Sequence, residues 1–179
     1  REWKEEPRKG TYLEKENVWS HEIDFWGGDI ASTMSRLDHV QQLGADVLYL
    51  NPVVLAYTNH KYDALDYNAL SPEYGTRDDV KSLAAETKKR GMKLVLDGVF
   101  NHMGRNSPKF KDAETNVKSP YRNWFVFGAQ FKGGARTWWN AQNLPELNLE
   151  NKAVRDHLWA APDSVVRSYL RDGVDGWRL

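Results

Sequence analysis

Three short segments carry the side chains of this sequence that could do chemistry. They are Asn59–Asp63, Asp97–His102 and Trp177–Arg178, and they contain imidazoles, a phenol, carboxylates and a guanidinium. Such a set suits a neutral ligand with many hydroxyl groups: Tyr62 can stack under a sugar ring, His102 can donate to a hydroxyl, and Arg178 can keep a nearby carboxylate ionised. Taken singly, each residue more often caps a turn, makes an ordinary hydrogen bond or lies on the surface. The co-occurrence of the three segments favours a ligand site.

The acidic residues limit the reaction that such a site could carry out. Glycoside hydrolysis requires two carboxyl groups that flank the scissile bond. Asp63 and Asp97 are the two carboxylates that we expect at strand ends. The sequence contains no cysteine, which excludes a cysteine nucleophile, a thiolate metal site and a disulfide scaffold.

Two helices are predicted between these segments. Apolar residues recur at spacings of three and four over 30–43, which predicts one amphipathic helix that ends at Gly44. A second helix begins at Thr76, which stands in capping-box spacing with Asp79, and ends at Gly91.

Short apolar runs predict the strands. Residues 47–50 and 93–96 are expected to be strands buried on both faces, and 173–179 looks like the start of another strand. A third helix is predicted from Asn151 to about residue 170, with Pro162 expected to kink or split it. This alternation predicts an α/β fold with a parallel sheet. The carboxyl ends of parallel strands meet at one edge, so the three polar segments are expected around one cleft.

The remaining stretches show no sustained period. Residues 1–28 and 51–75 are predicted to be irregular. Residues 103–149 form an insertion too long for an ordinary connection, which predicts a small subdomain or lid. Trp138 and Trp139 within it would either extend a sugar-binding lid or pack in the subdomain.

Composition excludes several classes of partner. The chain has 179 residues, 25 Lys and Arg against 25 Asp and Glu, and a formal net charge of zero. Nucleic-acid binding relies on a basic surplus, so we expect no nucleic-acid partner. No run approaches the roughly 18 apolar residues of a membrane span, so we expect a soluble protein without a membrane partner. The length suggests one domain.

Five motifs resemble those of the α-amylase family of retaining glycoside hydrolases, which is glycoside hydrolase family 13. They follow one another along the chain in the same order as in that family. Residues 97–102 resemble the signature at the end of the third barrel strand, and 44–52 resemble the second-strand motif. Residues 59–67 are similar to a stretch of the neopullulanase and cyclomaltodextrinase branch. Residues 144–148 resemble a motif of the inserted domain, and 173–179 resemble the lead-in to the catalytic nucleophile.

This resemblance implies an incomplete (β/α)8 TIM barrel that holds about strands two to four, with an inserted small subdomain after the third strand. Residues 1–102 would be the N-terminal part of the catalytic barrel, 103–149 the inserted subdomain and 150–179 the continuation of the barrel. The family pattern also places the Asp nucleophile directly after Leu179 and the acid/base Glu further on. The segment by itself is therefore expected to be inactive.

The resemblance also implies roles for individual residues. His102 and Arg178 would contact the sugar or the nucleophile, and Asp97 would brace the site from behind. The implied substrate-binding residues are Asn59, His60, Tyr62, His102 and Arg178. Asn101 and Asn148 occupy positions that contribute to a calcium site in many members, although Asn148 replaces an Asp found in several of them. No cofactor is otherwise required.

The implied activity is hydrolysis of α-1,4-glucosidic bonds in starch-like glucans or malto-oligosaccharides through a covalent glycosyl-enzyme intermediate. Two alternatives stay open. One is a transglycosylase of the same family, because the choice between hydrolysis and transfer depends on how acceptor water is excluded. The other is a non-catalytic barrel relative that acts as a binding or ancillary subunit.

Overall fold

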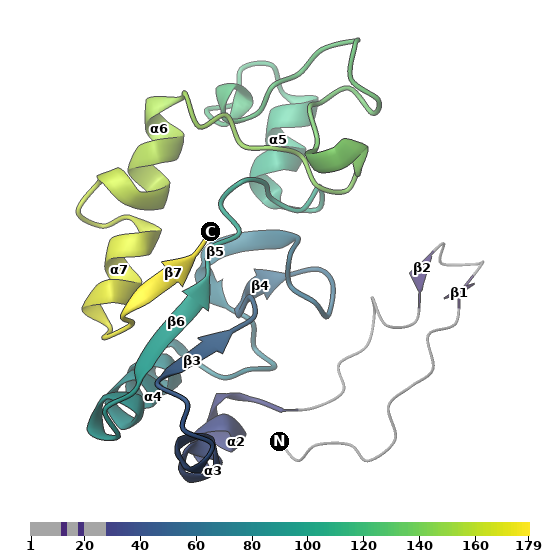
Figure 1. Ribbon diagram of the computed structural model, residues 1–179. Coiled ribbons are helices and arrows are strands. Elements are labelled where there is room, and N and C mark those ends of the chain that lie inside the picture. The colour runs from purple at the N-terminus through teal and green to yellow at the C-terminus, as the bar shows by residue number, and fades with distance from the viewer. Residues whose placement is uncertain (1–11, 14–17, 20–27) are drawn as a thin grey trace.

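A three-stranded parallel sheet lies at the centre of the computed structural model, which describes residues 12–13, 18–19 and 28–179 (Figure 1). The strands are β3 (Val47–Leu50), β6 (Lys93–Asp97) and β7 (Gly176–Arg178), in the spatial order β3-β6-β7. In the register, Leu50 lies opposite Leu96, and Asp97 lies opposite Arg178. All three strands therefore end at the same edge, and the predicted parallel α/β arrangement is confirmed.

Burial differs between the strands. In β6, Leu94 and Leu96 are buried because β6 has a neighbouring strand on each side. In β3, Val47 is 51% exposed and Tyr49 is 41% exposed. The prediction that this strand is buried on both faces is wrong for the described part of the chain, where β6 is the one strand that pairs with β3.

The first predicted helix is two helices, α2 (Ile30–Met34) and α3 (Leu37–Gln42). The break falls at Ser35, whose hydroxyl donates to the Ser32 carbonyl at 2.7 Å. Hydroxyl side chains that bond nearby carbonyls compete with the helix hydrogen bonds, and Ser32 and Thr33, just before the break, make such bonds as well. Gly44 follows α3 with a φ of 74°, so the predicted helix end is confirmed.

Helix α4 (Arg77–Lys89) agrees with the sequence pattern. Thr76 and Asp79 form the predicted reciprocal capping box, and Gly91 follows the helix with a φ of 71°. The buried face comprises Val80, Leu83, Ala84 and Thr87. This face packs α4 against β6 and against α2, which anchors the strand that leads to Asp97.

The third predicted helix is split, as expected. Asn151 caps α6 (Lys152–Arg155), which continues as a π-helical turn, η3 (Asp156–Ala160). The chain breaks at Pro162 and resumes as α7 (Val165–Arg171), which lies beside β7 (Figure 1). The ring of a proline cannot continue the helical hydrogen bonding, so the split is confirmed.

Two antiparallel strand pairs lie in segments predicted to be irregular. Strands β4 (Val54–Ala56) and β5 (Ala64–Leu70) pair with two register shifts, which disrupt the alternation that would have revealed them. Strands β1 (Tyr12–Leu13) and β2 (Val18–Trp19) also pair. The irregular assignment of 1–28 is wrong at those two dipeptides, and the rest of 1–27 lies outside the described residues.

Residues 103–149 rise above the ends of the parallel strands (Figure 1). They contain α5 (Pro108–Thr115) and two single 3-10 turns, η1 (Arg122–Trp124) and η2 (Trp138–Asn140). The fully buried Phe110 meets Phe125 edge-on with ring centroids 4.9 Å apart. An aromatic cluster thus gives this segment local packing of its own.

Candidate functional site

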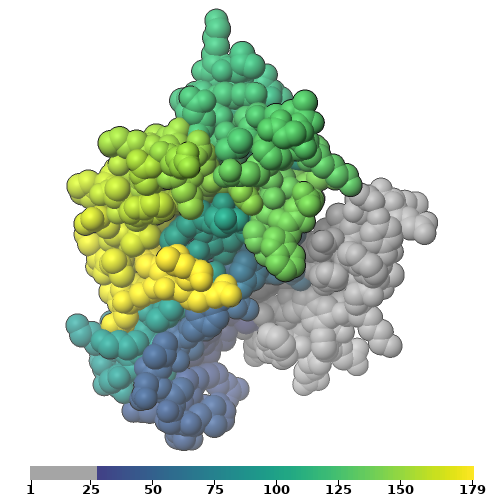
Figure 2. Space-filling view, turned by 45° about the horizontal axis from the view of Figure 1, so that its top comes forward, coloured from purple at the N-terminus to yellow at the C-terminus, as the bar shows by residue number. Residues whose placement is uncertain are grey.

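A cavity of about 1070 Å³ opens where β6 and β7 end. Figure 2 shows the hollow: residues of 103–149 (green) and the C-terminal residues (yellow) stand on either side of a teal floor. The polar and aromatic residues that line it are His60, Tyr62, Asp97, Phe100, Asn101, His102, Trp138, Asn143, Trp159, Trp177 and Arg178. Apolar side chains cover most of the remaining wall, which suits a ligand with both polar edges and apolar faces.

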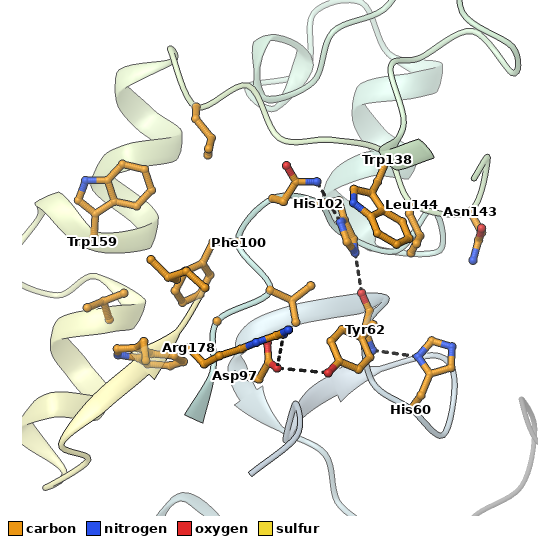
Figure 3. Close-up of a pocket in the computed structure, with 17 residues that line it drawn as sticks. His60, Tyr62, Asp97, Phe100, His102, Trp138, Asn143, Leu144, Trp159 and Arg178 are labelled. Atoms are coloured by element: carbon orange, nitrogen blue, oxygen red, sulfur yellow. Dashed lines mark hydrogen bonds and ion pairs between the residues drawn. The ribbon is translucent and has the colours of Figure 1, made fainter. Parts of the chain in front are cut away.

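Asp97 is the centre of the polar network (Figure 3). Its Oδ2 accepts from the Tyr62 hydroxyl at 3.2 Å, from Arg178 Nη1 at 2.9 Å and from the Tyr49 hydroxyl. The Asp97 side chain is 2% exposed, whereas that of Arg178 is 58% exposed. Three donors compensate the burial of this carboxylate, and the exposed guanidinium remains able to contact a ligand.

Tyr49 is a member of this network that the sequence reasoning missed. Its partner across the sheet is Val95, two residues before Asp97, so Tyr49 and Asp97 lie on the same face. Side chains alternate between the two faces of a strand, so the position of Tyr49 in the run 47–50 was a signal in the sequence for this placement. Removal from solvent and the adjacent Asp97 carboxylate raise the pKa of Tyr49, so its phenol remains a hydrogen-bond donor.

The hydrogen bonds of His102 define its tautomer. Nε2 lies 3.0 Å from the Tyr62 carbonyl oxygen, which can only accept, so Nε2 carries the proton. Nδ1 then accepts from Asn101 Nδ2 at 3.2 Å. Burial lowers the pKa of His102, which favours this neutral form. His102 was expected to donate to a sugar hydroxyl, but the one N–H of its neutral ring donates to the Tyr62 carbonyl in this structure.

The loop that carries His60 and Tyr62 is held by internal hydrogen bonds. Asp63 accepts from the Thr58 backbone N–H at 3.1 Å and from its hydroxyl at 2.6 Å. His60 Nδ1 accepts from the Tyr62 backbone N–H at 3.1 Å. Asp63 is thus turned into the loop, and it is not among the cavity-lining residues, contrary to the prediction of a strand-end carboxylate in the same cleft as Asp97.

Lys61 and Asn59 complete this loop outside the cavity. Lys61 has a φ of 64°, and its Nζ lies 2.9 Å from Glu73 Oε1 with a side chain that is 3% exposed. The Asn59 carbonyl accepts from the Tyr74 hydroxyl at 3.4 Å. Asn59 does not line the cavity, so the structure does not bring it together with the other predicted substrate-binding residues.

The two asparagines of the expected calcium site are neutral amides in different surroundings. Asn101 lines the cavity, whereas Asn148 Nδ2 donates to the Asn123 carbonyl and its Oδ1 accepts from the Glu150 N–H. Calcium takes six to eight oxygen ligands, usually with carboxylates among them. In the part of the chain that the structure describes, no group of three or more His, Cys, Asp or Glu side chains could hold a metal ion. Asn101 and Asn148 could contribute only amide oxygens, so calcium binding at these positions stays a prediction.

The comparisons with known proteins agree on one family. Residues 7–179 match the family model described as the alpha amylase catalytic domain. A cyclomaltodextrinase from a Bacillus species is 37% identical over 162 residues, which cover 87% of this chain and 28% of that protein. Neopullulanase 2 from Thermoactinomyces vulgaris is 34% identical, covering 87% of this chain and 27% of that protein. The chain thus spans just over a quarter of the length of these curated relatives.

A solved structure shows the same similarity in three dimensions. The cyclic alpha-maltosyl-(1-->6)-maltose hydrolase from Arthrobacter globiformis, in complex with cyclic alpha-maltosyl-(1-->6)-maltose, superposes with a TM-score of 0.79 at 39% sequence identity. The match covers 88% of this chain and 36% of that one. Among the helices described in the present chain, none has the length and apolar character needed to cross a membrane.

Proposed function

The chain belongs to the α-amylase family, and from this premise we propose that it is part of an enzyme that hydrolyses α-1,4-glucosidic bonds in starch-like glucans or malto-oligosaccharides. The observation that carries the proposal is the convergence of Tyr62, Asp97 and Arg178 at one cavity. The relatives named cyclomaltodextrinase and neopullulanase support the same substrate class. Nucleic acid and membrane have no part in the proposal.

The proposed architecture is part of a (β/α)8 barrel, in which β3, β6 and β7 are strands two, three and four. The parallel order β3-β6-β7, with helices in the connections, supports this assignment. We divide the chain into residues 1–102 and 150–179, which belong to the barrel, and 103–149, the inserted subdomain. The insertion then stands at the carboxyl ends of the strands, where barrel enzymes bind their substrates.

Each side chain has a proposed role that follows from its contacts. The Tyr62 ring stacks on the sugar at the cleavage point, and Arg178 contacts that sugar or the nucleophile from its exposed position. Asp97 orients both, because a single carboxylate oxygen accepts from both side chains. His102 contributes by fixing the Tyr62 backbone through its Nε2 proton. His60 lines the same cavity next to Tyr62 (Figure 3), where it would contact the substrate.

Retaining hydrolysis needs a nucleophile and a general acid/base about 5 to 5.5 Å apart. Asp97 is the one carboxylic acid among the described residues that line the cavity, and three donors already occupy it. We therefore assign it a positioning role and assign the two reacting carboxyl groups to residues that follow Leu179 in the full-length protein. Carboxyl groups perform this chemistry without a cofactor, so none is included.

The test uses the full-length protein with maltoheptaose, β-cyclodextrin and soluble starch. We expect release of reducing sugars, and NMR of the first product should show the α-anomer, as retention requires. Tyr62→Ala should lower kcat/KM about 100-fold, since small misplacements in a catalytic site have effects of this size. Its melting temperature should fall by about 3 °C or less, because Asp97 keeps Tyr49 and Arg178 as donors.

The matched control for this variant is Tyr57→Ala. Tyr57 is 53% exposed and does not line the cavity, so kcat/KM should be retained. Absence of hydrolysis of all three glucans by the wild type would refute the proposed activity. Parallel losses of melting temperature and turnover in Tyr62→Ala would refute the role of Tyr62.

A further inference from the structure

Two tryptophans at the rim of the cavity have no role in the proposal above. Trp138 and Trp139 stack with ring centroids 5.3 Å apart and an angle of 13° between their planes. Trp138 also faces the His102 ring at a centroid distance of 5.8 Å and lines the cavity (Figure 3). The three rings therefore form a row that leads from the cavity wall to the outside.

The outer ring of this row is strongly exposed. Trp139 is 85% exposed, whereas Trp138 is 42% exposed. A tryptophan that served subdomain packing would bury most of its large apolar surface, as Trp124 does at 7% exposed. Burial of apolar surface within the described chain therefore does not account for Trp139.

The backbone of Trp139 adopts an unfavourable conformation. Trp139 has φ 48° and ψ 33°, and Asn140 has a φ of 61°, so two consecutive residues other than glycine adopt the left-handed region. Bulky residues rarely adopt that region, and such strain persists only where the surroundings enforce it. Glycine would fit this turn at lower cost because it has no Cβ.

Hydrogen bonds hold the turn in place. The Trp138 N–H donates to the Leu144 carbonyl at 3.1 Å, and the N–H groups of Ala141 and Leu144 donate to the carbonyls of Trp138 and Ala141 at 2.8 and 2.9 Å. An isolated antiparallel β-bridge between Thr137 and Pro145 closes the base of the turn. The exposed ring is therefore presented by an ordered segment, which reduces the entropic cost of binding a ligand.

We propose that Trp139 is a sugar-binding platform that stacks on a glucosyl unit of the same glucan chain whose neighbouring unit occupies the cavity. A flat indole face matches the apolar C–H face of a pyranose, and its N–H can donate to a hydroxyl. The ring row from His102 through Trp138 gives the platform its continuity with the cavity. This assignment rests on the proposed function, because it takes the cavity to hold an α-glucan.

The experiment compares kcat/KM for maltoheptaose and for maltose in the full-length protein. Trp139→Ala and Trp139→Gly should lose about five- to tenfold on maltoheptaose, which lies within the roughly two- to thirteenfold range of one aromatic contact, and change less than about twofold on maltose. Trp139→Phe should retain most of the maltoheptaose activity. The control is Val117→Ala, at a 75% exposed position of the same insertion outside the cavity lining, which should behave as wild type.

The glycine variant separates a ligand-binding role from a structural one. Glycine adopts a φ of 48° without strain, so the melting temperature of Trp139→Gly should not fall. Equal kcat/KM values for wild type and Trp139→Ala on maltoheptaose would overturn the platform. Equal losses on both substrates, together with a lowered melting temperature, would overturn it as well, since that result describes a structural residue.

A failure of the proposed function gives a different result, because the wild type would then hydrolyse none of the glucans. Maltoheptaose binding to the same variants can in that case be measured by calorimetry without turnover. Weaker binding by Trp139→Ala than by wild type or Val117→Ala would support the platform. Equal binding, or no binding by the wild type, would overturn it.

Discussion

Removal of the Tyr67 hydroxyl should loosen the loop that carries His102. Tyr67 lies in β5 and is 1% exposed, and its hydroxyl lies 2.9 Å from the Val99 carbonyl oxygen and 2.5 Å from that of His102. Burial raises the pKa of Tyr67, so the hydroxyl stays protonated and acts as the donor. This single contact joins β5 to both ends of the segment that follows Asp97.

The size of the effect follows from the burial of these groups. Tyr67→Phe removes one oxygen atom and leaves two carbonyl groups without this donor, which should lower the free energy of unfolding by about 1–3 kcal/mol. A domain of 150–250 residues loses roughly 2–4 °C of melting temperature per kcal/mol, and a larger one loses less, so we expect a decrease of about 1–6 °C in the full-length protein. Because the His102 carbonyl loses its anchor, KM for maltoheptaose should also rise.

Calorimetric melting of the full-length protein measures the first effect, and steady-state kinetics measure the second. Tyr57→Phe is the matched control, because Tyr57 is 53% exposed and the same substitution at a surface position usually changes stability by about 0.5 kcal/mol or less. A melting temperature of Tyr67→Phe within about 1 °C of the Tyr57→Phe value would refute the reasoning.

Two further predictions concern stability. A Cβ at Gly104 would lie 2.5 Å from the Asp63 carbonyl oxygen, so Gly104→Ala should cost about 1–3 kcal/mol in urea unfolding, as overpacking usually does. At Gly176 the nearest atom would be 3.8 Å away, so an equal loss in Gly176→Ala would contradict this explanation. Burial lowers the pKa of His102 and His157 below the unfolded value of about 6.5, so the unfolded state binds more protons. The melting temperature should therefore fall as the pH decreases from about 6.5 to 5. The fall should be less steep in His157→Phe. A melting temperature that does not change over this pH range would contradict the prediction.

The sequence by itself determined the local features of this protein. The capping box of Thr76 and Asp79, the helix end at Gly44 and the split at Pro162 are all present as predicted. Each depends on residues within about four positions of one another, whose geometry is nearly independent of the rest of the fold. The parallel strands were predicted for a related reason, because continuous apolar runs between helices have few other arrangements.

Only the tertiary structure decided how the site is connected. The partners of Asp97 lie 35, 48 and 81 residues away in the chain. Strand register brings Tyr49 and Arg178 to its Oδ2, and the loop before β5 brings Tyr62 there. The packed structure also turns Asp63 towards Thr58 and directs His102 Nε2 to the Tyr62 carbonyl. Residue types and spacing identify groups able to make such contacts, but the choice among partners depends on which donors and acceptors the packed chain places within about 3 Å of each other.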